Sequence, residues 1–274
     1  MSAEWVEASK SFKCPHCESD HWCSYNVRNK GWVCMRSSGG KPTKNGGSWF
    51  PEGENNRPKF IPKPKPEEPH IDAAALMNTF RRDTNTQDVA LLAHNLGVSL
   101  QSLIDVGVAW ARPHSAWAFP MFAGTGQCVG IRLRLRDGRK ISVRGGREGL
   151  FLPRIRPAHT AYIVEGPTDL SAALTLGLWG IGRPSCRGGI AHTQVAINRL
   201  GIRRCILIGD NDLSKWENQE SPGIDGAKHL AHELQVPVAT MLLPTKDLRQ
   251  FVNDGGTAAL LGAMEEQLVW RQPR

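Results

Sequence analysis

Short apolar runs alternate with helical patterns from residue 158 to residue 245. The apolar runs have the length and β-branched content of buried strands: YIV, LWGIG, CILIGD and VPVATMLL. Between them, apolar residues recur at the helical period in PTDLSAALTLG, HTQVAINRLG and IDGAKHLAHELQ. Parallel strands joined through single helices require right-handed crossovers. The pattern therefore predicts an α/β domain, a parallel sheet with flanking helices.

The preceding stretch, residues 69–157, orders its elements differently. It begins with two helical patterns, IDAAALMNTFRR and TQDVALLAHNLG, and the second is expected to stop at Gly97. Four strand-like runs follow: AWAFPMFA, CVGIRLRLR, KISVRGG and LFLP. Between the second and third runs, Asp137 and Gly138 form a dipeptide typical of a tight hairpin turn. We expect a mixed α+β subdomain.

The two ends of the chain differ from these modules. Residues 1–57 predict a small ribbon with short strands around SYNV and KGWVC, and residues 58–68 are a Pro- and Lys-rich stretch expected to form a semi-extended linker. Residues 246–274 are expected to be helical. Their apolar positions near helical spacing suit either packing on the chain's own α/β domain or docking of a partner: Leu260, Leu261, Met264, Leu268 and Val269.

Four cysteines cluster near the N-terminus, in CPHCESDHWCSYNVRNKGWVC. Cys-x-x-Cys is a typical zinc knuckle, so Cys14 and Cys17 are expected to bind zinc, with Cys23 and Cys34 as the other two ligands. Imidazole is also a good zinc ligand, so His16 and His21 stay open as replacements. The other cysteines stand singly in apolar surroundings and are expected to be core residues or to have no special role: Cys128, Cys186 and Cys205.

Composition and charge narrow the class of protein. The 274 residues include 40% hydrophobic residues and 9 Trp, enough to fill real cores. No apolar stretch approaches the length of a membrane span, and the first residues lack a signal-peptide layout, so we expect a cytoplasmic protein without membrane contact. The net charge of +8 favours a polyanionic partner.

Nearly all of the excess charge lies between Ile131 and Arg156. This segment holds eight Arg and one Lys against Asp137 and Glu148, which gives a local net charge of +7. In IRLRLRDGRKISVRGG, the Arg residues alternate with Ile, Leu and Val at the strand period. The pattern predicts a row of guanidiniums on one face of a hairpin, where phosphates can bind.

Carboxylates follow two of the predicted parallel strands. Glu165 comes after AYIV, and Asp210 and Asp212 come at the end of CILIGDND. Ligands bind at the carboxyl ends of parallel strands, and the i, i+2 spacing points both Asp side chains to one side. Three carboxylates at this edge can hold one or two hard divalent cations such as magnesium.

EGPTDLSAAL followed by ILIGDND resembles the Toprim domain that is shared by bacterial and phage primases, topoisomerases and some nucleases. The later SPGIDGAKHLAHEL is similar to the helix that follows in primases. Here LSKWENQESP separates this helix from Asp212. The separation leaves open whether Asp225 is a metal ligand or a helix-initiating acid. FPMF, GIRLR, DGRK and GLFLP resemble the region before the Toprim domain in phage-type primases. On this resemblance, four residues are candidates for triphosphate or template contact: Arg132, Arg134, Lys140 and Arg144.

The resemblance covers nearly the whole chain and implies a DNA-dependent RNA primase. Glu165, Asp210 and Asp212 would then be catalytic, with magnesium or manganese as the catalytic cation and zinc as a structural one. The implied partners are a single-stranded DNA template and ribonucleoside triphosphates. The ribbon is expected to present aromatic and basic residues to the template, although each also suits the ribbon's small core: Trp22, Tyr25, Arg28 and Trp32.

Other protein classes fit the sequence less well. Non-catalytic recombination clamps combine a zinc motif with a Toprim domain, but they carry a helix-hairpin-helix motif that is not found in this sequence. A Toprim nuclease stays open, because the same cations could activate water. A topoisomerase is disfavoured because its nucleophilic tyrosine must reach DNA. The only tyrosines in the sequence are Tyr25 in the ribbon and Tyr162 inside a predicted strand. No GxxxxGK[ST] motif occurs, so we expect a helicase or replication initiator to act in trans.

Overall fold

The computed structural model describes residues 5–44, 46–52, 71–211 and 221–273. The chain divides into two compact units, Met1–Glu68 and Pro69–Arg274. The expected linker 58–68 and the predicted ligand Asp212 lie outside the described residues.

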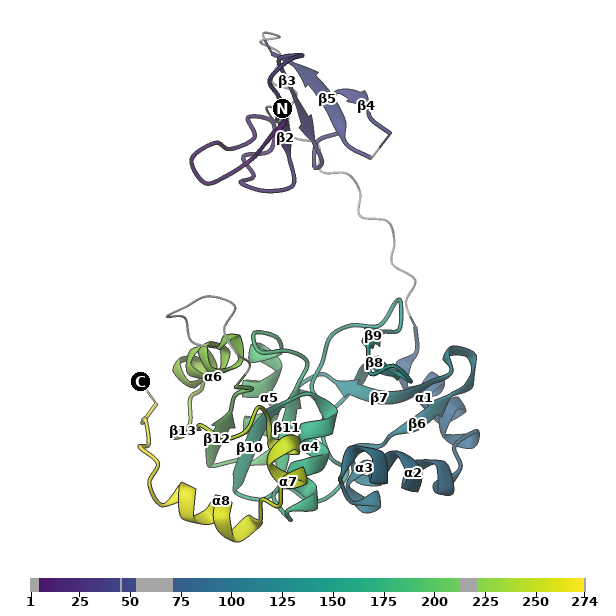
Figure 1. The fold of residues 1–274 in the computed structure, drawn as a ribbon, viewed down its shortest axis with the longest axis vertical. Coiled ribbons are helices and arrows are strands. Elements are labelled where there is room, and N and C mark those ends of the chain that lie inside the picture. Colours follow the sequence, from purple (N-terminus) through teal and green to yellow (C-terminus); the bar gives the residue numbers. More distant parts are fainter. Residues whose placement is uncertain (1–4, 45, 53–70, 212–220, 274) are drawn as a thin grey trace. The chain divides into compact units, whose positions relative to one another are not determined.

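The first unit is built on an antiparallel sheet (Figure 1). Its strands, in spatial order, are β1 (Trp5–Glu7), β2 (Ser24–Asn26), β3 (Gly31–Cys34), β5 (Ser48–Pro51) and β4 (Lys41–Pro42). The two predicted strands are present as β2 and β3. The core of this unit is very small, because besides the cysteines its buried apolar residues are Ala8, Trp32 and Phe50. A unit of this size needs a further staple to stay folded.

The second unit begins with three helices, α1 (Ala73–Arg82), α2 (Thr86–Leu96) and α3 (Leu100–Val106). Asp72 and Asn85 cap the first two, since their side chains accept hydrogen bonds from the Ala75 and Gln87 amides. Gly97 ends α2 as predicted, with a φ of 68° that an L side chain rarely adopts. The short α3 was not predicted.

A four-stranded antiparallel sheet follows the helices. Its order is β6 (Ala109–Ala111), β7 (Ala116–Phe122), β8 (Cys128–Leu135) and β9 (Lys140–Ser142), with a 3₁₀ turn, Arg112–His114, between the first two strands. The predicted hairpin is formed by β8 and β9, and Gly138 in its turn has a φ of 86°. One face of this sheet packs on Ala73, Met77 and Phe80 of α1.

Helices α2 and α3 also bear on the question of a membrane. Among the described residues no single helix is long and apolar enough to cross a membrane. Taken together, α2 and α3 have the length and apolar composition of a span, but the two helices are bent by 109°. Each helix contributes buried apolar side chains to the protein core, among them Leu92 and Leu96 of α2 and Leu103 of α3.

The α/β part has a parallel sheet of order β11 (Gly180–Arg183), β10 (Thr160–Glu165), β12 (Arg204–Ile208) and β13 (Val238–Met241). All four predicted strands and the three predicted helices α4 (Gly166–Thr175), α5 (Ile190–Leu200) and α6 (Pro222–Glu233) are present. Alternate strand residues face different cores. One core contains α4, and the other contains α5 and α6, so helices cover both faces of the sheet.

The two modules of the second unit are joined through Leu150 and Phe151. Leu150 bridges to Phe122 of β7, and Phe151 bridges to Gly182 of β11, with two backbone hydrogen bonds in each bridge. The predicted strand LFLP is therefore reduced to two isolated bridges, one to each sheet. Residues from both modules also share one hydrophobic core.

The C-terminal segment forms α7 (Leu248–Asn253) and α8 (Ala258–Glu265) and ends with a bridge between Arg271 and Val238 of β13. Leu261 is completely buried, and Met264 and Leu268 pack against the same core. Of the five apolar positions proposed for docking, only Leu260 and Val269 are exposed. The segment packs on the chain's own α/β domain, which is one of the two uses expected from the sequence.

Leu261→Ala is expected to lower the free energy of unfolding by about 2–5 kcal/mol, because it leaves a cavity in the core. Its neighbour Leu260 is 55% exposed, so Leu260→Ala is the matched control and should change stability by about 0.5 kcal/mol or less. Urea unfolding measures both. Equal effects of the two substitutions would contradict a packed tail.

Candidate functional site

The four N-terminal cysteines form a compact cluster. Their sulfur atoms all lie within 4.8 Å of one another. The Cys17 and Cys23 sulfurs are 3.6 Å apart, and those of Cys23 and Cys34 are 3.9 Å apart. A tetrahedral zinc with bonds of about 2.3 Å holds its sulfur ligands about 3.8 Å apart. The spacing thus fits a metal ion and is too wide for a disulfide.

The fold brings these cysteines together from three places. Cys14 and Cys17 lie on one tight turn, in which the Glu18 amide donates to the Cys14 carbonyl oxygen. Cys23 directly precedes β2 and Cys34 ends β3, so the antiparallel pairing of these strands brings the second pair of sulfurs next to the first.

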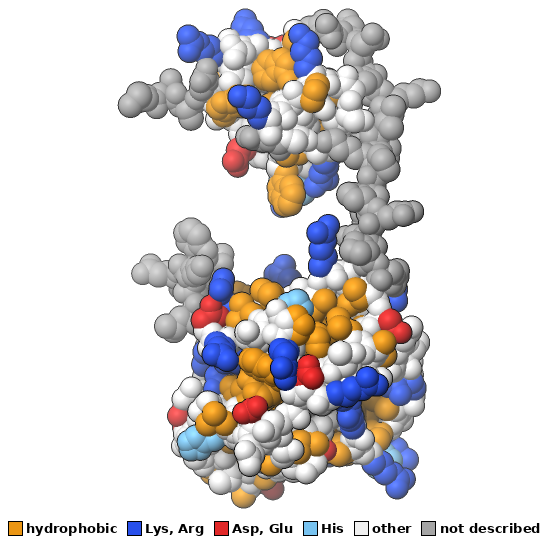
Figure 2. All heavy atoms as spheres, turned by 90° about the vertical axis from the view of Figure 1, so that its right-hand side faces the viewer, with side chains coloured by type: hydrophobic (Ala, Val, Ile, Leu, Met, Phe, Trp, Pro, Cys, Tyr) orange, Lys and Arg blue, Asp and Glu red, His pale blue; other side chains and the backbone are white. Residues whose placement is uncertain are grey.

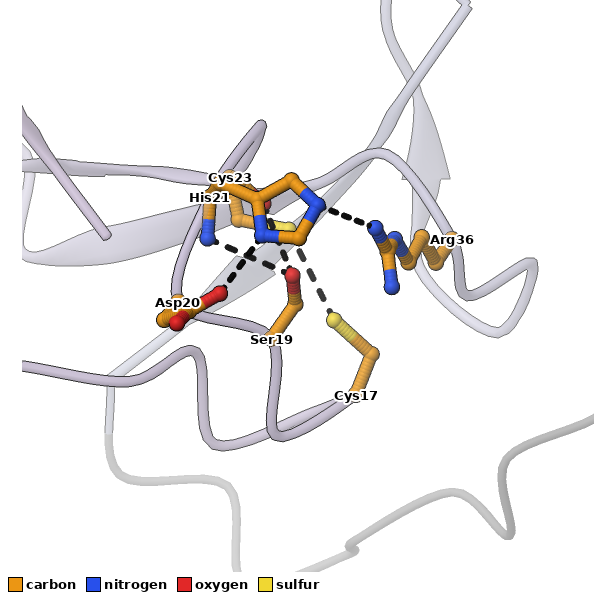
Figure 3. A network of polar contacts seen from close by, with 6 residues as sticks. All are labelled: Cys17, Ser19, Asp20, His21, Cys23 and Arg36. Carbon is orange, nitrogen blue, oxygen red and sulfur yellow. Dashed lines mark hydrogen bonds and ion pairs between the residues drawn. The ribbon is translucent and has the colours of Figure 1, made fainter. Parts of the chain in front are cut away.

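The two histidines proposed as alternatives lie outside the cluster of sulfurs. His21 uses both ring nitrogens elsewhere: Nδ1 contacts Asp20 at 2.5 Å and Nε2 contacts Arg36 at 2.8 Å (Figure 3). His16 stacks on Phe50 with ring centroids 4.0 Å apart. The sulfur geometry therefore favours the set of four cysteines over either histidine.

The metal-free thiols perturb one another strongly. A hydrogen bond from Cys14 lowers the pKa of Cys34 to about 5, and the same contact raises the pKa of Cys14. Burial raises the pKa of Cys23 to about 11. A cation bound here would compete with protons at these sulfurs, so its affinity should fall as the pH falls.

Cys23→Ser is expected to lose most of the bound metal, whereas His21→Ala should keep about one zinc per chain. The measurement is the zinc content of the purified protein, determined with a colorimetric chelator after digestion. Retention of zinc by Cys23→Ser together with loss by His21→Ala would assign the third ligand to the histidine.

Two of the three predicted catalytic carboxylates lie at one edge of the parallel sheet. Glu165 ends β10, and Asp210 follows β12 after Gly209. The register that pairs Ile163 with Leu207 places Glu165 level with Gly209, one residue before Asp210. Adjacent strands are about 4.8 Å apart, so side chains from these two ends can reach a common cation.

The backbone around each carboxylate is tightly constrained. Gly166 has a φ of 84°, which lets the chain pass directly from β10 into α4. At the other strand, Ser221 donates its hydroxyl to the Asp210 carbonyl oxygen at 2.5 Å and also caps α6. A Cβ at Gly223 would lie 2.3 Å from that same oxygen, so α6 begins in direct contact with the loop.

Arg183 is a buried cation at the same edge. It ends β11 directly opposite Glu165 and is 5% exposed. Its Nε donates to the Gly188 carbonyl, while one terminal nitrogen has no hydrogen-bond partner among the described residues. Burial lowers the pKa of this guanidinium and the charge of Glu165 opposes that effect, so the two groups interact electrostatically.

Asp169 and Asp247 are two further acids that the sequence reasoning did not assign. Asp169 lies one helical turn into α4 and is 4% exposed, and its Oδ1 accepts a hydrogen bond from the Arg249 amide. Asp247 caps α7 by accepting from the Gln250 amide. Burial, followed by the charge of Asp247, raises the pKa of Asp169 to about 7. The sequence feature that could have identified Asp169 is its i, i+4 spacing from Glu165, which places it near the end of the same strand.

The predicted basic residues separate into two groups. Arg132 and Arg134 lie on β8, and Lys140 begins β9, directly opposite Arg134. The Lys140 ammonium lies 3.7 Å from where a Gly166 Cβ would be, which brings it beside Glu165. Burial lowers the pKa of Arg134, the charge of Arg249 lowers it further, and that of Asp169 opposes both effects. Arg144 is exposed in the turn after β9, away from this row.

Other charged residues were left open by the sequence. Asp225 is 54% exposed at its side chain and pairs with Arg187 at 2.8 Å, which fits a helix-initiating acid. Arg139 pairs with Asp137 across the hairpin turn at 2.6 Å.

Figure 2 shows one face of the molecule, on which Lys and Arg side chains are spread among hydrophobic ones.

The ribbon residues proposed for template contact differ in exposure. Trp32 is 7% exposed and belongs to the small core, whereas Trp22 is 78% exposed. Tyr25 is half-buried and donates its hydroxyl to Glu52 at 2.6 Å, and Arg28 is exposed. Trp22 and Arg28 are therefore accessible to a ligand, and Trp32 is not.

Asp169→Asn is expected to stabilise the protein at pH 8 by about 1–3 kcal/mol. The folded chain keeps the Asp169 proton up to pH 7, but an unfolded aspartate releases it near pH 4, so wild-type stability falls as the pH rises between these values. Asparagine still accepts from the Arg249 amide but does not titrate. Urea unfolding without added magnesium should show a larger gain in stability for the variant at pH 8 than at pH 5. A variant less stable than wild type at pH 8 would contradict the raised pKa of Asp169.

No protein-family model matches the sequence, and no curated protein matches it. Solved structures do match. A DnaG catalytic core aligns with a TM-score of 0.56 and 17% identity, over 72% of this chain and 80% of that one.

Two further primase structures give the same result. A DnaG primase catalytic domain bound to ssDNA aligns with a TM-score of 0.55 and 13% identity, over 72% of this chain and 78% of that one. The zinc-binding and RNA polymerase domains of the Aquifex aeolicus primase align with a TM-score of 0.56 and 13% identity, over 73% of this chain and 60% of that one. The chain has a primase-like fold, which confirms the resemblance inferred from the sequence at the level of fold.

Proposed function

We propose that the chain is a DNA-dependent RNA primase whose α/β part is a Toprim domain. The observation that carries the proposal is the position of Glu165 and Asp210. They follow adjacent parallel strands at one sheet edge, in a fold similar to primase catalytic cores. Asp212, two residues after Asp210, is proposed as the third carboxylate.

The donor set at this edge fits magnesium or manganese. Carboxylate oxygens are hard ligands, and the acids Asp169 and Asp247 lie nearby, with Asp169 protonated up to about pH 7. A cation bound there would lower the pKa of the attacking 3′-hydroxyl and neutralise charge on the phosphates. The protein's own contribution is positional: Lys140 and Arg134 lie beside the acids, where they can bind triphosphate oxygens.

The N-terminal unit is proposed to bind structural zinc through its four cysteines. Its small core supports this, because the metal would supply the stability that Trp32 and Phe50 alone cannot. We propose that its exposed Trp22 and Arg28 contact single-stranded template by stacking and charge. We further propose a helicase or replication initiator as a partner in trans, recruited through a surface other than the packed C-terminal segment.

Glu165→Gln and Asp210→Asn are each expected to reduce primer synthesis on the order of 100-fold or more, because each removes a proposed cation ligand. Asp225→Asn is the matched control, since Asp225 is an exposed acid in an ion pair, and it should retain wild-type activity. The assay incubates single-stranded DNA with magnesium and labelled ribonucleotides and resolves products by length.

The products decide between activities as well as between residues. Short oligoribonucleotides that disappear in Glu165→Gln support the primase. Shortened template would instead show a nuclease that uses the same carboxylates. Near wild-type synthesis by Glu165→Gln or by Asp210→Asn would remove that residue from the catalytic site.

A further inference from the structure

A row of four side chains crosses the antiparallel sheet of the second unit. Trp110 on β6 is directly opposite Trp117 on β7, Trp117 is opposite Arg134 on β8, and Arg134 is opposite Lys140 on β9. Directly paired residues share a face of a sheet. This face is the one opposite α1, because the intervening positions on β6, β7 and β8 belong to the core that packs on α1.

One end of the row reaches the proposed catalytic edge. The Lys140 ammonium lies beside Gly166, and Arg134 is close enough to Asp169 and Arg249 to interact with their charges. Three strand spacings separate Lys140 from Trp110, about 14 Å. A few nucleotides of single strand span that distance.

The other end of the row is a pocket of about 360 Å³. The indoles of Trp110 and Trp117 form one side, with ring centroids 5.1 Å apart and planes at 67°. The Arg136 guanidinium lies 5.8 Å from the centre of the Trp110 ring. Helix α2 supplies the remaining lining residues: Asp88, Leu91, Leu92 and Asn95.

The chemistry of this pocket suits an unpaired base. Half-buried indoles offer flat apolar surface for stacking, but they are too close to enclose a base between them, so one base would stack on a single indole face. Asn95 offers both a donor and an acceptor to a base edge. The Asp88 carboxylate accepts hydrogen bonds from a base and repels a phosphate, whereas Arg136, which also lines the pocket, and Arg134 on β8 attract phosphates.

We propose that this pocket, lined by Trp110, Trp117 and α2, binds one unpaired base of the single-stranded DNA whose adjoining phosphates follow Arg136 and Arg134 toward the catalytic edge. The proposal rests on the proposed primase function for the identity of the strand. Charge complementarity and the continuous row from the pocket to Lys140 favour a nucleic acid over a peptide.

The test compares two labelled single strands of equal length and charge, one with bases and one abasic, by fluorescence anisotropy without ribonucleotides. Wild-type protein should prefer the strand with bases. Trp117→Leu keeps apolar packing but removes the stacking surface, so it should weaken binding of that strand by about 5-fold or more. Binding of the abasic strand should be unchanged.

Two further variants make the result interpretable. Leu91 is 60% exposed at the pocket, so Leu91→Glu preserves the core, and its charge and size should lower the preference for bases in the same way. Trp270→Leu is the matched control, because Trp270 also lies under a guanidinium, that of Arg204 at 5.1 Å, but does not line the pocket. It should bind both strands like wild type.

Wild-type preference for bases in both Trp117→Leu and Leu91→Glu would overturn the proposal. Equal weakening of both strands would also overturn it, because it would show a loss of charge or fold and not of stacking. If DNA binding is unchanged and only stimulation by a helicase is lost, the pocket belongs to a protein partner and the proposal is wrong. A protein that shows the base preference but synthesises no primers would refute the primase function and leave the pocket assignment standing.

Discussion

The pairing of β10 with β12 is the constraint on which the candidate site depends. Parallel strands end at the same edge, so this single register brings Glu165 beside Asp210 although 45 positions separate them in the sequence. Side chains on both faces of the sheet hold the register, because alternate residues of each strand enter different cores. A slip by one residue would exchange those cores and move the carboxylates apart.

The second constraint is the junction of the two sheets. Phe122 pairs with Leu150, and Phe151 pairs with Gly182, so neighbouring residues connect the antiparallel sheet to the parallel one. This junction keeps Arg134 on β8 and Lys140 on β9 near the acid Asp169 of α4. The electrostatics of the site therefore result from packing between modules, since Arg134 and Asp169 are far apart in sequence but interact in the fold.

Periodicity was sufficient for elements whose burial is regular. It identified the four parallel strands as short apolar runs buried on both faces, the helices between them by their helical spacing, and the hairpin by the alternation in β8 and the turn at Gly138. It could not identify β5, whose Ser-Trp-Phe-Pro sequence has no alternation, or predict that LFLP pairs with two different sheets. Asp169 was also missed, since its burial and its neighbour Asp247 are properties of tertiary packing.

Leu150 and Phe151 set a limit on how this molecule can change length. The first enters the core beneath α5 and α6, and the second enters the core beneath α4, although they are adjacent in the chain. An inserted or deleted residue next to them would send each side chain to the wrong side of the parallel sheet and shift both backbone bridges at once. Natural relatives should therefore vary in length in the loops on either side of this dipeptide and keep a pair of large apolar residues at it.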